Sequence, residues 1–415
     1  MTEFSTRHDF EAGDLRDRFR IPLGPDGEDC LYLCGNSLGL QPASTSDAVN
    51  AELERWGRLG VAGHFDGPVG WMDFHRPIAD ALAPLVGAQA NEVVAMNALT
   101  VNIHLMMASF YRPTAERRRV LMEKGAFPSD RHAVISQIEL HGYSGAEDLV
   151  ELAPRRDGLL HEEDLEDYLE RYGDQTALVL WPGVQYATGQ VFDMERISRA
   201  CRRAGVTLGL DLAHAVGNVP VQLHDWGVDF AVWCSYKYLN AGPGAVAGCF
   251  IHDKHVNDEM PRLSGWWGHE RATRMKMPPD FIPSRGADGW QISNPPILSL
   301  ATLPPSLELF GEVGIDRLRA ASTAMTGHLA TKINEELGDR LDIVTPLEPH
   351  RRGCQLSIRV REGQQQGRAL FERLEAHGII GDWREPDIIR VAPAPLYNSI
   401  ADCDRLVSAM AKLFP

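Results

Sequence analysis

From about Glu92 onward, short apolar segments alternate with amphipathic ones, and this alternation restricts the possible folds more than any other feature of the chain. The apolar segments at 93–96, 120–122 and 177–181 are expected to be strands. Each leads into an expected helix, at 101–111, 129–140 and 194–204. Strands that alternate with helices predict βαβ units and a parallel sheet covered on both faces. Because ligands of such sheets bind beyond the carboxyl ends of the strands, functional residues are expected there.

The length and the pattern together predict a two-domain α/β protein, since 415 residues are enough for more than one domain. Residues 1–60 are expected to form an N-terminal arm that packs with a small domain. Residues 61–300 are expected to form a large domain, and residues 301–415 the small one. The proline- and tryptophan-rich segment 260–296 is expected to be an irregular loop. Further expected elements are helices through Glu52 and Trp56, through 307–310 and at 367–377, and strands at 355–360 and 388–391.

The composition argues against several classes of protein. A formal net charge of −16 disfavours a nucleic-acid partner, whose phosphates attract basic surfaces. No apolar stretch approaches the roughly 20 residues of a membrane span, and residues 1–10 lack the apolar core of a signal peptide. Among the seven cysteines, Cys30 and Cys34 lie close together but have no matching second pair, so no metal site is expected. Reduced thiols, as in the cytoplasm, are the expectation.

A lysine and an aspartate at the ends of two apolar strands point to a cofactor. Lys237 follows the apolar run 230–234 and precedes the glycine-containing turn 240–244. Asp211 ends the preceding apolar strand. Pyridoxal phosphate enzymes need this arrangement, because the lysine binds the coenzyme covalently and the aspartate keeps the pyridine nitrogen protonated. Taken alone, Asp211 would more often cap the following helix, and His214 is equally well a histidine packed near the sheet edge.

Two strand-to-helix junctions offer further coenzyme contacts. Leu99 and Thr100 open one helix, where backbone N–H groups and a hydroxyl suit a phosphate, although threonine is also a common cap. Phe127, Ser129 and Asp130 occupy the next junction. There Phe127 is suited to stack on a pyridine ring, and Asp130 either reaches the ring edge or caps its own helix.

Seven motifs in a fixed order carry a resemblance to a known family. They are Gly35–Gly39, Ala126–Asp130, Asp211–His214, Ser235–Tyr238, Gly265–His269, Ser293–Pro296 and Arg390–Pro393. From about residue 30 to the C-terminus, the chain closely resembles kynureninases. The resemblance implies an α/β, fold-type I (aspartate aminotransferase-like) pyridoxal phosphate enzyme with a mainly parallel sheet. Such hydrolases cleave L-kynurenine or 3-hydroxy-L-kynurenine to L-alanine and anthranilate or 3-hydroxyanthranilate.

The resemblance also implies roles for individual residues. Catalysis falls to Lys237 and Tyr236, and Arg390 grips the substrate carboxylate. The residues implied to hold the coenzyme are Leu99, Thr100, Phe127, Ser129, Asp130, Asp211, His214, Tyr236 and Lys237, joined by Trp266 and Asn294 from a second subunit of a homodimer. Without the resemblance, a strand-end arginine such as Arg390 would be assigned to a surface ion pair.

The remaining expectations concern the substrate and a departure from the family. Ser37, His64, Ser293 and Asn294 match substrate-binding positions, and polar groups there would favour a 3-hydroxyl on the ring. His64 is almost equally well an ordinary loop histidine. Pro182 stands where some relatives have Ser or Thr, so a coenzyme contact from that hydroxyl is in doubt.

Two rival functions are weaker. A cysteine desulfurase needs a cysteine on a mobile loop, whereas the C-terminal region offers Cys354 in an expected strand and Cys403 in the last helix. A catalytically inert coenzyme-binding protein would have no use for Lys237, Asp211 and Arg390 together.

Overall fold

A seven-stranded sheet forms the centre of the larger part of the molecule, in a computed structural model that describes residues 10–414. In spatial order the strands are β4 (Val93–Ala95), β10 (Gly248–Ile251), β9 (Phe230–Trp233), β8 (Thr207–Asp211), β7 (Thr176–Pro182), β5 (Arg119–Glu123) and β6 (Leu149–Leu152). Strands β9, β8, β7, β5 and β6 run parallel to one another, whereas β10 is antiparallel to both of its neighbours, β9 and β4.

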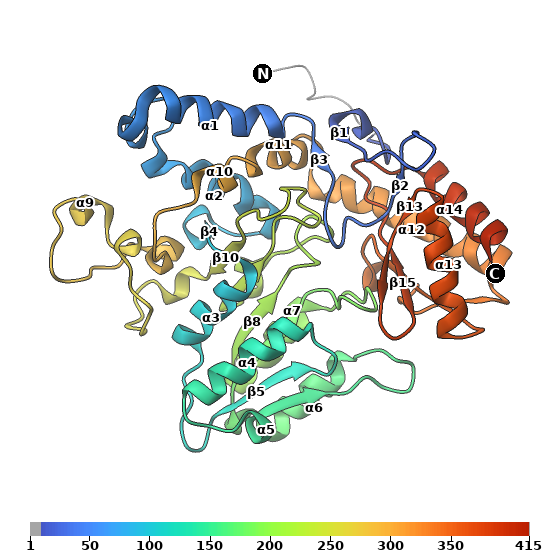
Figure 1. Ribbon diagram of the computed structural model, residues 1–415. Helices are drawn as coiled ribbons and strands as arrows, with labels where there is room; N and C mark the ends of the chain where they lie inside the picture. The colour runs from blue at the N-terminus through green and yellow to red at the C-terminus, as the bar shows by residue number, and fades with distance from the viewer. Residues whose placement is uncertain (1–9, 415) are drawn as a thin grey trace.

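Both faces of this sheet are buried, as the apolar strands predict. Successive residues of β9 alternate between two core clusters, with Ala231 and Trp233 in one and Phe230 and Val232 in the other. Side chains of α6 (Glu162–Tyr172) and α7 (Met194–Ala204) belong to the first cluster, and those of α3 (Leu99–Phe110) and α4 (Pro128–Leu140) to the second. The expected covered parallel sheet is therefore confirmed (Figure 1).

The predicted elements agree closely with the observed ones where the apolar period is strong. The helix expected at 194–204 is α7 without change, and the helix expected at 129–140 is α4, which begins one residue earlier at Pro128. Strands β6 and β10 were not predicted. Strand β6 contains Glu151, which interrupts its apolar run, and β10 comes soon after a glycine-containing turn.

A smaller antiparallel sheet with three helices lies to one side, in orange and red in Figure 1. Its strands in spatial order are β11 (Leu341–Ile343), β12 (Leu356–Val360), β15 (Ile388–Val391) and β14 (Asp382–Arg384). Its helices are α12 (Ile315–Leu337), α13 (Gln364–Ala376) and α14 (Ile400–Leu413). Apolar residues from all three helices and from β12 and β15 form one core cluster.

Segments near the N-terminus contact both parts of the molecule. Strand β2 (Leu31–Tyr32) pairs in parallel with β13 (Ile379–Ile380), and Leu31 belongs to the core of the small sheet. The expected helix through Glu52 and Trp56 is α1 (Thr45–Leu59), which contacts α11 (Leu303–Val313). Side chains of α11 pack in the core of the large sheet. The domain boundaries at 60 and 300 stay a prediction.

The segment 260–296 is mostly irregular, as expected. It contains the short helix α9 (Arg271–Arg274) and two single 3-10 turns, and in Figure 1 it projects from the large sheet on the side away from the small one. Within residues 10–414, no helix is both long enough and apolar enough to cross a membrane.

Candidate active site

A pocket opens at the carboxyl ends of the parallel strands, where the strand pattern predicts it. The space within it that no protein atom fills, open solvent included, is about 690 Å³. Strand β8 ends at Asp211, β5 ends at Glu123, and Lys237 follows β9 after a short turn. The residues that line the pocket include eight of the predicted site residues, namely Leu99, Thr100, Phe127, Asp130, Asp211, His214, Tyr236 and Lys237.

Lys237 faces a buried histidine inside this pocket. Its Nζ atom lies 3.1 Å from Nε2 of His214, and about 6 Å from the ring centres of Phe127 and Tyr236. Burial, followed by the nearby positive charge of Lys237, lowers the pKa of His214 well below its usual range. His214 is therefore neutral at physiological pH, and its Nε2 can accept a hydrogen bond from the lysine amine.

The carboxyl groups of Asp211, Asp130 and Glu123 line the same pocket. Asp211 accepts a hydrogen bond from the Ala213 backbone N–H at 2.8 Å, so its side chain also stabilises the turn that follows β8. Burial, and then the adjacent charge of Asp211, raises the pKa of Asp130 well above its usual range. Burial likewise raises the pKa of Glu123 to about 8. Asp130 and Glu123 are thus protonated near neutral pH.

The junctions before α3 and α4 place two hydroxyl groups together. Thr100 Oγ1 and Ser129 Oγ lie 2.8 Å apart, although Thr100 lines the pocket and Ser129 does not. The backbone N–H groups of the first turn of α3 have no partner within the helix. Phe127 lies at the junction before α4 and meets the Tyr186 ring edge-on, with ring centres 5.3 Å apart.

Arg390 lies beside the pocket and is already paired. It is 1% exposed, and its Nε donates to Asp382 at 2.6 Å and its Nη1 to the Tyr186 carbonyl at 2.6 Å. Its Nη2 donates to Ser37 Oγ at 3.1 Å and also bonds Asp382. Although burial opposes ionisation of Asp382, hydrogen bonds from Arg390 and Ser37 hold its pKa below its usual value. Ser37 and Arg390 therefore belong to one network, linked to the pocket through Tyr186.

Besides Ser129, Ser37 and Arg390, four further predicted residues lie outside the pocket of the single chain. The Trp266 indole donates to the Arg274 carbonyl at 3.1 Å, and 44% of Trp266 is exposed. Ser293 and Asn294 are also exposed, and the His64 ring packs edge-on against Trp71. None of the four lines the pocket.

Three residues of this region were not predicted. Glu123 is detectable in principle, because a carboxyl group that ends an apolar strand is unusual. Tyr186 and Asp382 gave no local signal, since they meet Arg390 only through the fold. Pro182 lines the pocket and pairs with Asp211 in the strand register.

The pocket fits pyridoxal phosphate, because some of its buried polar groups have no hydrogen-bond partner within the protein. Asp130 Oδ1 and His214 Nδ1 are buried and have no hydrogen-bond partner. An unpaired buried polar atom costs about 1–3 kcal/mol, so such atoms call for a ligand. A reactive amine, an aromatic face, a carboxylate and a helix N-terminus all border the same space, and they match the imine carbon, ring, pyridine nitrogen and phosphate of the coenzyme.

Comparisons with known proteins agree with this assignment. A family model described as the kynureninase C-terminal domain matches residues 318–410. The kynureninase of Xanthomonas oryzae pv. oryzae strain PXO99A is 56% identical over 415 residues, covering 98% of each chain. The kynureninase of Xanthomonas axonopodis pv. citri strain 306 is 57% identical over 395 residues, covering 95% of this chain and 93% of the relative.

Solved structures with lower identity share the fold. The cystine C–S lyase C-DES, in complex with its product cysteine persulfide, has a TM-score of 0.79 at 19% identity, over 93% of this chain and 98% of its own. The apo cysteine desulfurase of Thermococcus onnurineus NA1 also has a TM-score of 0.79, at 15% identity and 97% coverage of both chains. The fold is therefore that of the fold-type I enzymes, and the near full-length identity to its relatives shows that the chain belongs to the kynureninase family.

Proposed function

We propose that this chain is a hydrolase that cleaves the Cβ–Cγ bond of L-kynurenine, 3-hydroxy-L-kynurenine or both. The products are L-alanine and anthranilate or 3-hydroxyanthranilate. The observation that carries the proposal is the placement of Lys237 Nζ, 3.1 Å from a neutral histidine in a pocket that Asp211 and Phe127 also line. Membership of the kynureninase family supports the choice of substrate.

The coenzyme is pyridoxal phosphate, which supplies a ring that withdraws electrons from the bonds of the bound amino acid. Lys237 would hold it covalently, and Phe127 would lie against the ring. Asp211 would pair with the pyridine nitrogen, while Asp130, kept protonated by burial, would donate a hydrogen bond nearby. Leu99, Thr100 and Tyr236 would bind the phosphate, with Ser129 holding the Thr100 hydroxyl in place.

Lys237 Nζ is the group that removes the proton from the substrate α-carbon. For this step the amine has to be unprotonated, and His214 Nε2 offers an acceptor for one of its hydrogens. The Phe127 and Tyr236 rings lie about 6 Å from the amine. Proximity to the bound substrate accounts for the role of the lysine.

Tyr236 is the proposed acid that returns a proton at the end of the reaction. Burial, followed by the neighbouring Cys234, raises the pKa of Tyr236 above its usual value. Its hydroxyl is therefore protonated throughout the physiological range and able to donate. The water that adds to the side-chain ketone of the substrate enters through the open side of the pocket.

Arg390 is the proposed partner of the substrate carboxylate. Its guanidinium already makes a two-point contact with the Asp382 carboxylate, which has the same shape as the group to be bound. Substrate binding would place a second carboxylate against Arg390 and Ser37. Asp382 then acts as a positioning residue that holds the guanidinium in place beside Tyr186.

A homodimer with shared active sites belongs to the same proposal. Trp266, Ser293 and Asn294 are exposed and lie outside the pocket of their own chain, which supports a role in the pocket of a second subunit. His64 is proposed to complete the pocket around the substrate ring, where polar groups would favour the 3-hydroxyl. Seven buried, unpaired cysteines support a reducing compartment, the cytoplasm.

Cysteine desulfurase activity is disfavoured despite the shared fold. That activity needs an accessible thiol, whereas Cys354 and Cys403 are 2% and 1% exposed. Burial also raises the pKa of the Cys354 thiol to about 12, which makes it a poor nucleophile.

Product analysis tests the proposed function. The purified protein, supplied with pyridoxal phosphate, is given L-kynurenine and 3-hydroxy-L-kynurenine in separate reactions. We expect stoichiometric alanine and the corresponding aryl acid, with faster release from the 3-hydroxy substrate. If a coenzyme-loaded protein cleaves neither compound, the proposed function is wrong. A faster reaction with L-kynurenine would overturn the proposed role of the polar ring contacts alone.

A further inference from the structure

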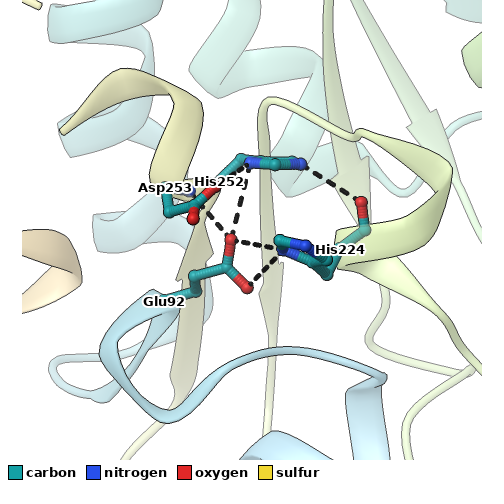
Figure 2. Close-up of side chains that lie close together, drawn as sticks. All are labelled: Glu92, His224, His252 and Asp253. Atoms are coloured by element: carbon teal, nitrogen blue, oxygen red, sulfur yellow. Dashed lines mark hydrogen bonds and ion pairs between the residues drawn. The ribbon is translucent and has the colours of Figure 1, made fainter. Parts of the chain in front are cut away.

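Four side chains with metal-binding chemistry meet at the end of the large sheet opposite the active site. Glu92 directly precedes β4, His252 and Asp253 directly follow β10, and His224 lies in the short helix α8 (Leu223–Trp226). Because β4 and β10 are antiparallel, the start of one lies beside the end of the other. The active-site lysine follows the opposite end of β9, so the sheet separates the two groups of residues. Figure 2 shows the four side chains turned toward one another.

The ligand atoms of this cluster are spaced as a small metal ion requires. One nitrogen or oxygen from each of the four residues lies within 4.8 Å of all the others. Glu92 Oε1 lies 2.9 Å from His224 Nδ1 and 3.5 Å from His252 Nδ1, and His252 Nδ1 lies 3.0 Å from Asp253 Oδ1. Ligands of a tetrahedral zinc ion, at bond lengths of about 2.0–2.2 Å, lie about 3.3–3.6 Å apart. Of the three distances, 3.5 Å falls in that range, whereas 2.9 and 3.0 Å are shorter and would have to lengthen around an ion.

Glu92 is a fully buried carboxylate with no permanent cation as its partner. Its exposure is 0%, and across residues 10–414 its only ion-pair partners are the two histidines. The nearby Lys254 turns away and bonds the Gly227 carbonyl and Asp229. The backbone N–H groups of Gln89 and Asp253 each donate to Glu92 at 2.8 Å, and a protonated imidazole or a bound cation would supply the positive charge that a buried carboxylate needs.

The unprotonated ring nitrogen of His252 lies at the edge of the cluster, where it accepts a backbone hydrogen bond. His252 Nε2 lies 3.1 Å from the His224 carbonyl oxygen and donates to it, and Nδ1 accepts from the Lys254 backbone N–H at 3.1 Å. Nδ1 therefore carries the lone pair, and it also lies 3.5 Å from Glu92 Oε1 and 3.0 Å from Asp253 Oδ1, so an ion bound there would replace the Lys254 N–H as its partner. A histidine that donates its other N–H to a backbone carbonyl is the usual support of a metal ligand.

We propose that Glu92, His224, His252 and Asp253 bind a zinc ion. Two imidazole nitrogens and two carboxylate oxygens form a closed set of four ligands, which is characteristic of a structural site. The ion would join the start of β4, helix α8 and the end of β10, and thereby fix the antiparallel strand β10 between β4 and β9. The sequence contains no compact signature of such a site, because its four ligands come from three segments that lie far apart in the chain.

Zinc titration of the full-length, coenzyme-loaded protein tests this site. The protein is prepared without a polyhistidine tag, treated with a chelator and titrated with Zn²⁺ in a calorimeter, while Co²⁺ serves as a spectroscopic probe of tetrahedral geometry. We expect a single tight ion per chain, intense visible absorption with Co²⁺ and a higher unfolding temperature with Zn²⁺. Absence of tight binding, or a six-coordinate Co²⁺ spectrum, would overturn the proposal.

Variants locate the ion and separate its site from other histidine–carboxylate pairs. Asp253→Asn changes a partly exposed side chain, and His252→Gln removes the lone pair. Each is expected to weaken Zn²⁺ binding by about tenfold or more without changing the turnover of either kynurenine. His328→Gln is the matched control, because His328 forms a 2.7 Å pair with Asp404 elsewhere, and it should leave Zn²⁺ binding unchanged. Equal affinity in Asp253→Asn, His252→Gln and the parent protein would place the ion elsewhere.

Discussion

The two ends of the large sheet carry similar residue types but use them differently. At the carboxyl ends of the parallel strands, Lys237, Asp211 and His214 line a pocket, and buried atoms of His214 and Asp130 have no partner. At the opposite end, Glu92 and His224 bond each other directly, and no space separates them. Polar groups without partners around a pocket indicate a site that binds a large ligand. Groups in direct contact with one another suit a structural role or the binding of a small ion.

The largest expected effect comes from removing the lysine of the pocket. Lys237→Ala should reduce turnover by at least about 10⁴-fold, because both covalent attachment and proton transfer are lost. Lys254→Ala is the matched control, since Lys254 is ion-paired with Asp229 at the other end of the sheet. Steady-state kinetics on both variants measures the contrast. Comparable losses of turnover in Lys237→Ala and Lys254→Ala would contradict the assignment of catalysis to one end of the large sheet.

Asp211→Asn should have the next largest effect. The neutral amide does not hold a proton on the pyridine nitrogen, so turnover is expected to fall by about 10²–10³-fold, as for loss of a single electrostatic contact in an active site. Removal of the Asp211 charge should also lower the pKa of Asp130 toward its ordinary value, because that charge is one cause of its elevation. The carbonyl stretch of Asp130, followed by infrared spectroscopy against pH, reports this shift. An unchanged turnover would exclude the proposed role of Asp211.

Arg390→Lys should act mainly on substrate binding. A lysine cannot make the two-point contact that a guanidinium can make with the substrate carboxylate. The KM is therefore expected to rise by about 10–100-fold with a smaller change in kcat. Asp382→Asn, which keeps Arg390 but removes its charged partner, should raise the KM by less. If the substitution of Asp382 costs more than that of Arg390, the carboxylate contact is wrongly assigned.

Glu123→Gln tests the electrostatics of the pocket through stability. The pKa of Glu123 is about 8 in the folded protein against an ordinary value of 4.5, so the folded state binds more protons between these pH values. The contribution of Glu123 to the free energy of unfolding is therefore fully present below about pH 4.5 and is lost as the pH rises toward 8. In the coenzyme-free protein, urea unfolding should show this decline, on the order of a few kcal/mol. Glu123→Gln should flatten it, and an identical pH profile in the variant would mean that Glu123 is ionised in the fold.

Much of the pocket could be predicted from the sequence because its residues sit at strand ends. Lys237, Asp211 and the helix starts at Leu99 and Phe127 follow apolar runs that mark buried strands, and the parallel sheet brings those ends together. Local pattern and residue type were sufficient at these positions. The same reasoning recovered the covered sheet and helix α7.

The contacts that depend on distant parts of the chain could not be predicted. Asp382 and Tyr186 meet Arg390 only because β14 and β15 pair and the small sheet lies beside the pocket. The Glu92 cluster depends likewise on the pairing of β4 with β10, a strand that was not predicted. Trp266, Ser293 and Asn294 line no pocket in one chain, so their proposed contacts lie beyond what the single-chain fold contains.

The most direct test of the account is to locate the coenzyme on the chain. The coenzyme-loaded protein is reduced with borohydride, digested and mapped by mass spectrometry. We predict that the pyridoxyl phosphate mass is found on the peptide that contains Lys237 and on no other lysine. A label on a different lysine, or none at all in a protein that retains the coenzyme, would contradict the assignment of the pocket as the catalytic centre.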